Sequence, residues 1–499
     1  MSYNIYITKV KNIRPAENAD RLNLCEVFGN TTVVDKTVNE TDLYLYLPTD
    51  GRISVEFGEA NNLFRKKDDA GNNVGGFIDA EKRNISAIRL RGNKSDGLVL
   101  PLSSLSSFGD ITSLKEGDIV TVFNGHVIAE KYIPRRKNRQ GGNEQGNKTR
   151  KKKIDVAPLF KEHVDTEQLA YNLSAFKPGD EIEITLKMHG TSQRTGYLPV
   201  VNGYTAPLVA TWIAGRKGLF KLLKPTKKMV EWAENNIKPV YDWGYVSGTR
   251  RTVLENFDGG YYGSNEFREQ HSKFFEGKLW KGETVYYEVV GFTHSGTPIM
   301  ATGNNKKLND KEFVKKYGAE TVFSYGCHPN GCADGELTKY VTDAHGNKLV
   351  AFTQLPQSDI YVYRMTMTNE DGNVIEYTPD FMRYRCEQMG VKTVPVFAKV
   401  YVRDNAVISH NIDGTCSGGN IPEGWTTGDA VKNIAENFYD GPDPVGKTHI
   451  REGVVVRIIN RPKFTAYKHK SFEFRVLEGI IKDVAEAPDM EEGDGLNDV

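Results

Sequence analysis

The chain has 499 residues, a formal net charge of zero and 38% hydrophobic residues. This length exceeds what one hydrophobic core usually holds, so two or more domains are expected in a soluble, globular protein. Five cysteines, an odd number, argue against a disulfide scaffold. The first residues do not resemble a signal peptide and the apolar runs are only strand-sized, so we expect a cytoplasmic protein with no membrane partner; a phage-encoded origin would be consistent with this.

Residues 1–133 carry short runs of β-branched and aromatic residues between Gly, Asn and Asp, which predict strands. Short strands at this spacing indicate a small β-barrel of the OB type or a sandwich. The following stretch, 131–153, holds ten Lys or Arg and one Glu. We interpret 134–158 as a basic linker that contributes to RNA binding through phosphate contacts, with a plain solvated linker as the alternative.

Residues 159–482 read as a mixed α+β domain. We expect helices over 162–176 and 223–237, and a strand over 181–186 in which apolar residues alternate. Further strands are predicted at ETVYYEVVGF, SDIYVYRMTM, REGVVVRII and FTAYKHKSFEF. The last segment, 483–499, has seven Asp or Glu and no Lys or Arg, which predicts an acidic disordered tail.

Two lysines stand in similar tetrapeptides, KSDG at 94–97 and KMHG at 187–190. A lysine that attacks phosphorus must be neutral and needs open backbone beside it for a nucleotide. Lys187 meets this need, because it ends the alternating strand and is followed by Gly190. Lys94 follows a loop-like stretch inside the small β-region, so we interpret KSDG as an ordinary exposed turn of an accessory module.

Six short stretches follow one another from Lys187 onward: KMHGT (187–191), SGTRRT (247–252), YYEVVG (286–291), IYVYRM (360–365), REGVVVR (451–457) and AYKHK (466–470). Each alone is a weak signal, but six in this order over 284 residues form a strong one. Together they resemble the motifs of the covalent nucleotidyltransferases, the superfamily of polynucleotide ligases and RNA capping enzymes. The resemblance implies an α+β nucleotidyltransferase domain with ATP-grasp-like antiparallel sheets and flanking helices, preceded here by the OB-like domain.

The resemblance also implies a role for each motif residue. Lys187 would be the nucleophile, and Glu452 would hold Mg²⁺ or Mn²⁺ through water. Lys468 and Lys470, two residues apart on a strand, would face the same phosphate. The remaining nucleotide-binding residues would be His189, Gly190, Thr191, Arg251, Glu288 and Tyr363. Arg250 and Tyr361 remain open alternatives to Arg251 and Tyr363.

Particular residues favour RNA over DNA as the substrate. His189 stands where DNA ligases and capping enzymes generally have Asp, and KxHG followed by Thr resembles nick-sealing RNA ligases. The N-terminal stretches KVKNIRPAENADRLNLCEV and RLRGNKSDGL resemble the OB-type module that precedes the transferase domain in one group of RNA ligases. Two departures stand out: the interval from Glu288 to Tyr363 is 75 residues, and Arg364 follows Tyr363 where the family often has an acid.

The sequence therefore predicts an ATP-dependent RNA ligase that joins 3′-OH and 5′-phosphate RNA ends through lysyl-AMP and RNA-adenylate, at nicks or bridged breaks. An end-healing kinase or phosphatase is a candidate partner in RNA repair. The alternatives are a DNA ligase, a capping guanylyltransferase or an inactive RNA-binding protein. Cys327 and Cys332 in the long insert are interpreted as free thiols, with a zinc site completed by Cys386, Cys416 or His345 as the alternative.

Overall fold

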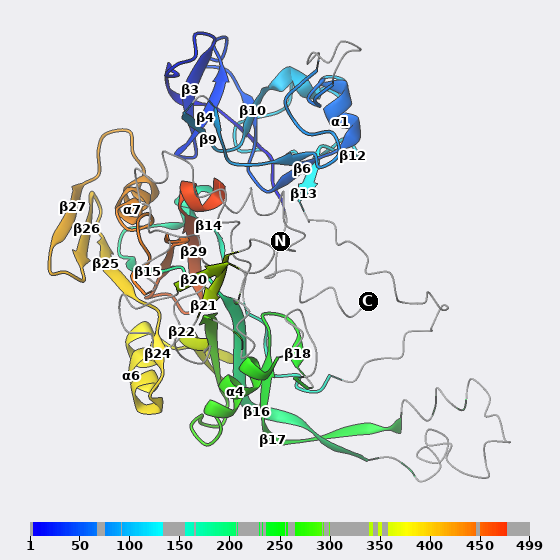
Figure 1. Ribbon diagram of the computed structural model, residues 1–499, viewed down its shortest axis with the longest axis vertical. Helices are drawn as coiled ribbons and strands as arrows, with labels where there is room; N and C mark the ends of the chain where they lie inside the picture. Colours follow the sequence, from blue (N-terminus) through cyan, green and yellow to red (C-terminus); the bar gives the residue numbers. More distant parts are fainter. Residues whose placement is uncertain are drawn as a thin grey trace.

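The computed structural model describes residues 3–66, 75–90, 92–132, 155–163, 166–205, 236–254, 265–291, 339–342, 348–351, 358–445 and 450–476, with residues 207, 229, 232, 256, 257, 293 and 299. Within these ranges the protein is α+β, with mainly antiparallel sheets and few helices (Figure 1). Most of the basic run, the whole acidic tail, Cys327, Cys332 and His345 lie outside the described residues.

The N-terminal part consists of small sheets around their own core, and its OB-like character stays a prediction. The core contains Ile5, Leu45, Ile53, Phe57 and Ile128, all buried. The strands are β1 (Tyr6–Thr8), β2 (Lys11–Pro15), β3 (Leu22–Val27), β4 (Asn30–Asp35), β5 (Tyr44–Leu47), β6 (Gly51–Ile53), β7 (Asn84–Ile85), β8 (Ile88–Leu90), β9 (Asn93–Ser95), β10 (Leu98–Pro101), β11 (Val122–Phe123), β12 (His126–Val127) and β13 (Ala129–Lys131). They pair as β1-β5-β10, β2-β3-β4, β13-β6-β7, β8-β9 and β11-β12, with helix α1 (Val55–Ala60) and a 3₁₀ turn (Leu102–Leu105) alongside.

The first large sheet carries Lys187 beside its central strand. Its order is β14 (Glu167–Gln168), β29 (Thr465–Lys470), β28 (Gly453–Ile458), β15 (Glu181–Leu186), β25 (Val396–Val402), β26 (Ala406–Asn411) and β27 (Cys416–Asn420). Neighbouring strands run antiparallel except β14 and β29. Strands β15 and β28 come from stretches that are far apart in the sequence. Their pairing brings the motif at 187–191 next to the motif at 451–457.

The second large sheet carries the middle motifs. Its order is β18 (Val253–Leu254), β17 (Lys238–Gly248), β16 (Thr191–Thr205), β19 (Glu283–Gly291), β22 (Ser358–Thr368) and β23 (Val374–Glu376), with β24 (Lys392–Thr393) parallel to β22. The distal halves of β16 and β17 form a twisted two-stranded arm that extends from the body in Figure 1. A separate hairpin pairs β20 (Lys339–Thr342) with β21 (Lys348–Ala351).

Among the described residues, helices α4 (Glu266–Phe274), α6 (Pro379–Met389) and α7 (Thr427–Glu436) pack on the sheets. Helix α7 begins with a capping box between Thr426 and Asp429. Helix α6 begins at Pro379 after the N-cap Thr378 and ends at Met389, before Gly390, whose φ of 70° suits the left-handed position that follows a helix. One buried cluster joins residues of both sheets and α7, among them Ile184, Val290, Tyr361, Val431 and Val456.

The predicted strands at 283–292, 358–367 and 451–459 are present as β19, β22 and β28. The predicted helix over 162–176 is wrong, because the chain there forms β14 and two 3₁₀ turns, at Leu169–Tyr171 and Leu173–Ala175. The final predicted strand ends at Lys470, and residues 472–476 are helical. Most of the predicted helix over 223–237 lies outside the described residues. In the described part of the chain, no helix has the length and apolar character needed to cross a membrane.

Candidate active site

Lys187 follows directly after β15, a strand whose side chains alternate between two environments. Ile182, Ile184 and Leu186 point into the core cluster. Glu183 and Thr185 line a cavity on the opposite face together with Lys187. The backbone N–H of Lys187 donates to the carbonyl of Gly453, 3.0 Å away. The alternation of apolar residues over 181–186 therefore places the side chain of Lys187 in the cavity. Lys187 is 9% exposed.

Glu452 is the carboxylate at the centre of the site. It precedes β28, and the antiparallel register of β15 with β28, in which Leu186 opposes Val454, brings it beside Lys187. Its Oε1 lies 2.7 Å from Nζ of Lys187, and its Oε2 lies 2.8 Å from Nδ1 of His189. Residues 187, 189 and 452, predicted as parts of two motifs, therefore meet in one cluster.

Strand β29 adds lysine side chains from the other side of β28. Lys470 opposes Gly453 and Lys468 opposes Val455, so the two lysines lie on one face, as predicted. Nζ of Lys470 lies 3.2 Å from the same Oε1 of Glu452 that contacts Lys187. Because Val455 lines the cavity, Lys468 lies on the cavity side of its strand.

The charges of this cluster are strongly coupled. Burial alone would raise the pKa of Glu452, but the charges of Lys187 and Lys470 and the bond with His189 outweigh it and hold the pKa well below its ordinary value. Burial lowers the pKa of His189, and the neighbouring Glu452 only partly offsets that effect. At neutral pH the site therefore combines an ionised carboxylate with a neutral imidazole.

The turn after Lys187 is packed tightly against β19. A Cβ added at Gly190 would lie 2.3 Å from the carbonyl oxygen of Val289, so only glycine fits there. The hydroxyl of Thr191 accepts a hydrogen bond from Nη2 of Arg268 at 2.6 Å. Gly190 and Thr191 thus fix the path of the chain from the first sheet into the second, and Arg268 of α4 supports that path.

Glu288 and Tyr363 form the wall of the cavity that belongs to the second sheet. The hydroxyls of Tyr363 and Ser192 are 2.8 Å apart, and burial together with the charge of Glu288 raises the pKa of Tyr363. The open alternative, Tyr361, is instead 8% exposed within the core cluster and does not line the cavity. The structure therefore brings Tyr363, and not Tyr361, to the cavity.

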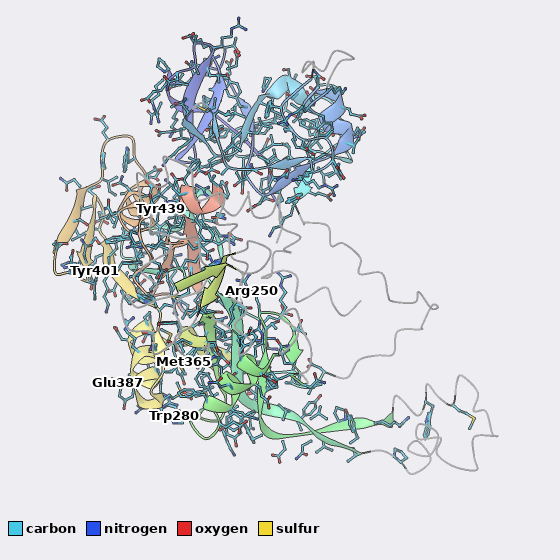
Figure 2. The ribbon with its side chains drawn as sticks, viewed as in Figure 1. Arg250, Trp280, Met365, Glu387, Tyr401 and Tyr439 are labelled. Carbon is cyan, nitrogen blue, oxygen red and sulfur yellow. The ribbon has the colours of Figure 1, made fainter. Side chains whose placement is uncertain are left out.

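The structure also separates the two adjacent arginines. Arg250 lines the cavity, whereas Arg251 is not among its lining residues. Figure 2 shows Arg250 in the central part of the molecule, near the meeting of the two sheets. The carbonyl of Arg250 accepts a hydrogen bond from the backbone of His163, which also lines the cavity. Of the two arginines that the sequence left open, Arg250 is the one at the cavity, and the binding role of either stays a prediction.

Arg364, the residue that departs from the family pattern, is not among the residues that line the cavity. It pairs with Glu376, and its guanidinium lies over the rings of Tyr286 and Phe464. Tyr286 opposes Arg364 and Tyr287 opposes Val362, so the strand register shifts at Tyr363 and strict alternation does not apply there. Tyr363 lines the cavity although an arginine follows it.

Several cavity residues were missed by the sequence interpretation. Glu183 and Thr185 belong to the alternation that ends at Lys187, so extending the period of two backward would have found them. Arg457 opposes Glu183 across β15 and β28, which only the strand register reveals. The other missed lining residues are His163, Thr166, Leu186, Met188, Met382, Arg383, Val394, Val455 and Phe464.

The donor set suits a divalent cation that shares its coordination with a ligand. Among the residues that the structure describes, no group of three or more His, Cys, Asp or Glu side chains is arranged to hold a metal by itself. Mg²⁺ usually takes one or two carboxylates and completes its shell with phosphate oxygens and waters. The ionised carboxylate of Glu452, beside the candidate nucleophile, fits a metal of that kind.

Neither a protein-family model nor a curated protein matches the chain. Solved structures of Naegleria gruberi RNA ligase are similar to it. A lysine-to-alanine mutant with ATP and Mn is 16% identical, with 96% of this chain and 98% of that chain covered and a TM-score of 0.48. A lysine-to-methionine mutant with AMP and Mn is 15% identical, covering 95% and 98%, with a TM-score of 0.49. The ligase with PPi is 15% identical, covering 97% and 99%, with a TM-score of 0.48.

Proposed function

We propose that this chain is an ATP-dependent RNA ligase that joins 3′-OH and 5′-phosphate ends through a lysyl-AMP intermediate. The observation that carries the proposal is the cluster around Glu452, in which one buried carboxylate contacts Lys187, His189 and Lys470. An ion pair that only stabilises the fold needs one cation for each buried carboxylate. Two lysines and an imidazole converging on one carboxylate, beside a cavity that also holds Glu288 and Tyr363, supply the groups that nucleotidyl transfer requires.

In the first step Nζ of Lys187 attacks the α-phosphorus of ATP. A nitrogen–phosphorus bond forms, the bond to the bridging oxygen breaks, pyrophosphate leaves and the amine loses a proton. Lys468 and Lys470, on the cavity face of β29, stabilise the charge that develops on the phosphate oxygens. A divalent cation bound at Glu452 would add positive charge to the phosphates and weaken the hold of this carboxylate on the ammonium form of Lys187.

The walls of the cavity position the nucleoside. Tyr363 presents its ring for stacking on adenine, and Glu288 accepts hydrogen bonds from ribose hydroxyls. Arg250 contacts a phosphate of the nucleotide or of the RNA end. In the second step an oxygen of the RNA 5′-phosphate attacks the lysyl-AMP phosphorus and releases Lys187. In the third step the 3′-OH attacks that 5′-phosphate, forms the phosphodiester and releases AMP.

A sealing assay distinguishes an RNA ligase from a general polynucleotide ligase and from a capping enzyme. Nicked duplexes are prepared with either RNA or DNA at the 3′-OH side, and each is incubated with ATP or GTP and Mg²⁺. We expect sealing with ATP and RNA 3′ ends, and none by Lys187→Ala. Sealing of all-DNA nicks at an equal rate would make the chain a general polynucleotide ligase. Adduct formation with GTP alone would indicate a capping enzyme.

A further inference from the structure

Asp96, the third residue of KSDG, is not part of an exposed turn. It follows β9 of the β8–β9 hairpin and is only 2% exposed. Its Oδ2 forms an ion pair with Nη1 of Arg475, a residue of the helical segment 472–476. The pair joins the N-terminal part to the last described segment of the chain. The interpretation of KSDG as an ordinary turn is therefore corrected: the tetrapeptide is a contact between two parts of the molecule.

The N-terminal part holds Asp96 firmly on its own side. The carbonyl of Asp96 accepts hydrogen bonds from the hydroxyls of Tyr46, at 2.9 Å, and Thr32, at 3.1 Å. The ring of Tyr46 packs in turn near Tyr171, which stacks on Tyr6. Because Tyr171 belongs to the segment beside β14, this aromatic cluster fixes the N-terminal part against the first large sheet.

On the other side, the segment that carries Arg475 packs against the candidate active site. The ring of Phe474 lies 5.0 Å from the ring of His189, edge to face, and Nζ of Lys470 lies 5.5 Å from the centre of the Phe474 ring. The backbone N–H of Ser471 donates to the carbonyl of Glu452 at 2.9 Å. Ser471 and Phe474, which precede Arg475 in the chain, are thus in contact with the site.

A second contact within the KSDG hairpin supports the same segment. Nζ of Lys94 lies 5.0 Å from the centre of the Phe472 ring. Lys94 and Asp96 are two residues apart, and they meet Phe472 and Arg475 within one short helix. The hairpin therefore contacts this helix at two points. Lys94 lies over the ring of Phe472, and Asp96 forms the ion pair with Arg475.

We propose that Asp96 is a positioning residue for nucleotidyl transfer. Through Arg475 it holds the segment 472–476 so that Phe474 keeps His189 and Lys470 in place around Glu452. This inference rests on the proposed function. Removal of either partner leaves the other charge uncompensated at the buried contact, so the segment shifts and the cluster loses its alignment. The nucleoside wall with Tyr363 and Glu288 lies on the second sheet and is unaffected.

The test measures the rate of lysyl-AMP formation in single turnover, over a range of ATP concentrations, for Asp96→Asn, Arg475→Gln and the double variant. We expect the rate at saturating ATP to fall about tenfold or more, with the half-saturating ATP concentration changed less than about twofold. The double variant should be no slower than the slower single variant, because both act through one contact. Glu26→Gln is the matched control, since Glu26 pairs with Arg14 on the exposed surface of the same N-terminal part.

Thermal unfolding of each variant separates positioning from plain stability. A wild-type rate in Asp96→Asn, at a temperature where that variant is folded, overturns this inference and leaves the proposed function standing. If Asp96→Asn does not fold, Arg475→Lys is compared with Arg475→Gln: a rate restored by lysine supports the inference, and equal rates overturn it. A wild-type protein that forms no adduct overturns the proposed function, and this inference with it.

Discussion

Nζ of Lys187 lies 2.7 Å from Oε1 of Glu452, and this contact joins the start of the catalytic region to its end. The two residues are far apart in sequence and meet because β15 and β28 pair antiparallel. In the absence of nucleotide, the ion pair favours the protonated lysine, whereas attack on phosphorus requires the neutral amine. In the proposed reaction Glu452 therefore has two roles, as the resting partner of the nucleophile and as the ligand of a divalent cation.

Replacing Glu452 by Gln tests the second role. The amide keeps the shape of the side chain but removes the charge that would hold the metal. We expect the rate of lysyl-AMP formation to fall by at least about a hundredfold, measured by single-turnover labelling. Glu269→Gln, on the exposed surface of α4, is the control and should react at the wild-type rate. A Glu452→Gln variant that reacts as fast as this control contradicts the assignment.

His189 predicts a dependence of stability on pH. Its pKa in the folded protein is lowered by burial, so between that value and about 6.5 the unfolded chain binds more protons than the folded one. The free energy of unfolding should therefore decrease as the pH falls through this window, by up to about 1.4 kcal/mol per pH unit. Urea unfolding of the wild type and His189→Gln at several pH values isolates the contribution, and parallel curves would contradict it.

If Tyr363 stacks on the base, its replacement should weaken ATP binding more than it slows the chemical step. Stacking on a base contributes about 1–3 kcal/mol, so Tyr363→Leu should raise the half-saturating ATP concentration about tenfold or more. Tyr363→Phe keeps the ring and loses only the contact with Ser192, so it should remain close to wild type. Tyr361→Phe, in the core, is the matched control. If Tyr363→Leu and Tyr361→Phe changed the half-saturating ATP concentration equally, the assignment of Tyr363 to the nucleotide site would be contradicted.

Arg250 and Arg251 form a natural pair of test and control. Because Arg250 lines the cavity and Arg251 is not among its lining residues, Arg250→Ala should reduce lysyl-AMP formation or sealing about tenfold or more, and Arg251→Ala much less. Rates of both reactions, measured with the same preparations, show which step depends on the arginine. A larger effect at Arg251 would restore the assignment made from the sequence.

The basic run predicts how RNA affinity depends on salt. Its lysines and arginines at 148–153 would neutralise phosphates, and each such contact contributes about one unit to the slope of log affinity against log salt. Replacing these residues by Ser should flatten the slope for nicked RNA, measured by filter binding or anisotropy between low and moderate salt. An unchanged slope would indicate a plain linker.

The individual strands of the site could be predicted from the sequence, but their assembly could not. Alternation before Lys187 and the Lys468–Lys470 pair are local patterns of period two, and both are present in β15 and β29. Tyr361 and Tyr363 are two residues apart, so a regular strand would turn both side chains to the same face. The register of β22 with β19 shifts between Val362 and Arg364, which separates the two tyrosines, and no local pattern in the sequence indicates that shift. The segment 162–176 has helical composition, yet it forms β14 and 3₁₀ turns because it pairs with β29 and packs against the N-terminal part.

KSDG shows the limit of local motif analysis most clearly. The tetrapeptide matches a nucleophile motif in letters, and its surroundings in sequence indicate an exposed turn. Only the fold shows that Asp96 is buried against Arg475, a residue nearly four hundred positions later. A contact between two segments so far apart in the chain leaves no periodic pattern in either of them, so no window of sequence could have revealed it.

The most direct test of the central claim is the intact mass of the protein after incubation with ATP and Mg²⁺. Wild type and Lys94→Ala should gain the mass of one AMP, and Lys187→Ala should gain none. A gain that persists in Lys187→Ala would place the nucleophile elsewhere. No gain in any of the proteins, with ATP or with GTP, would contradict the account of this chain as a nucleotidyltransferase.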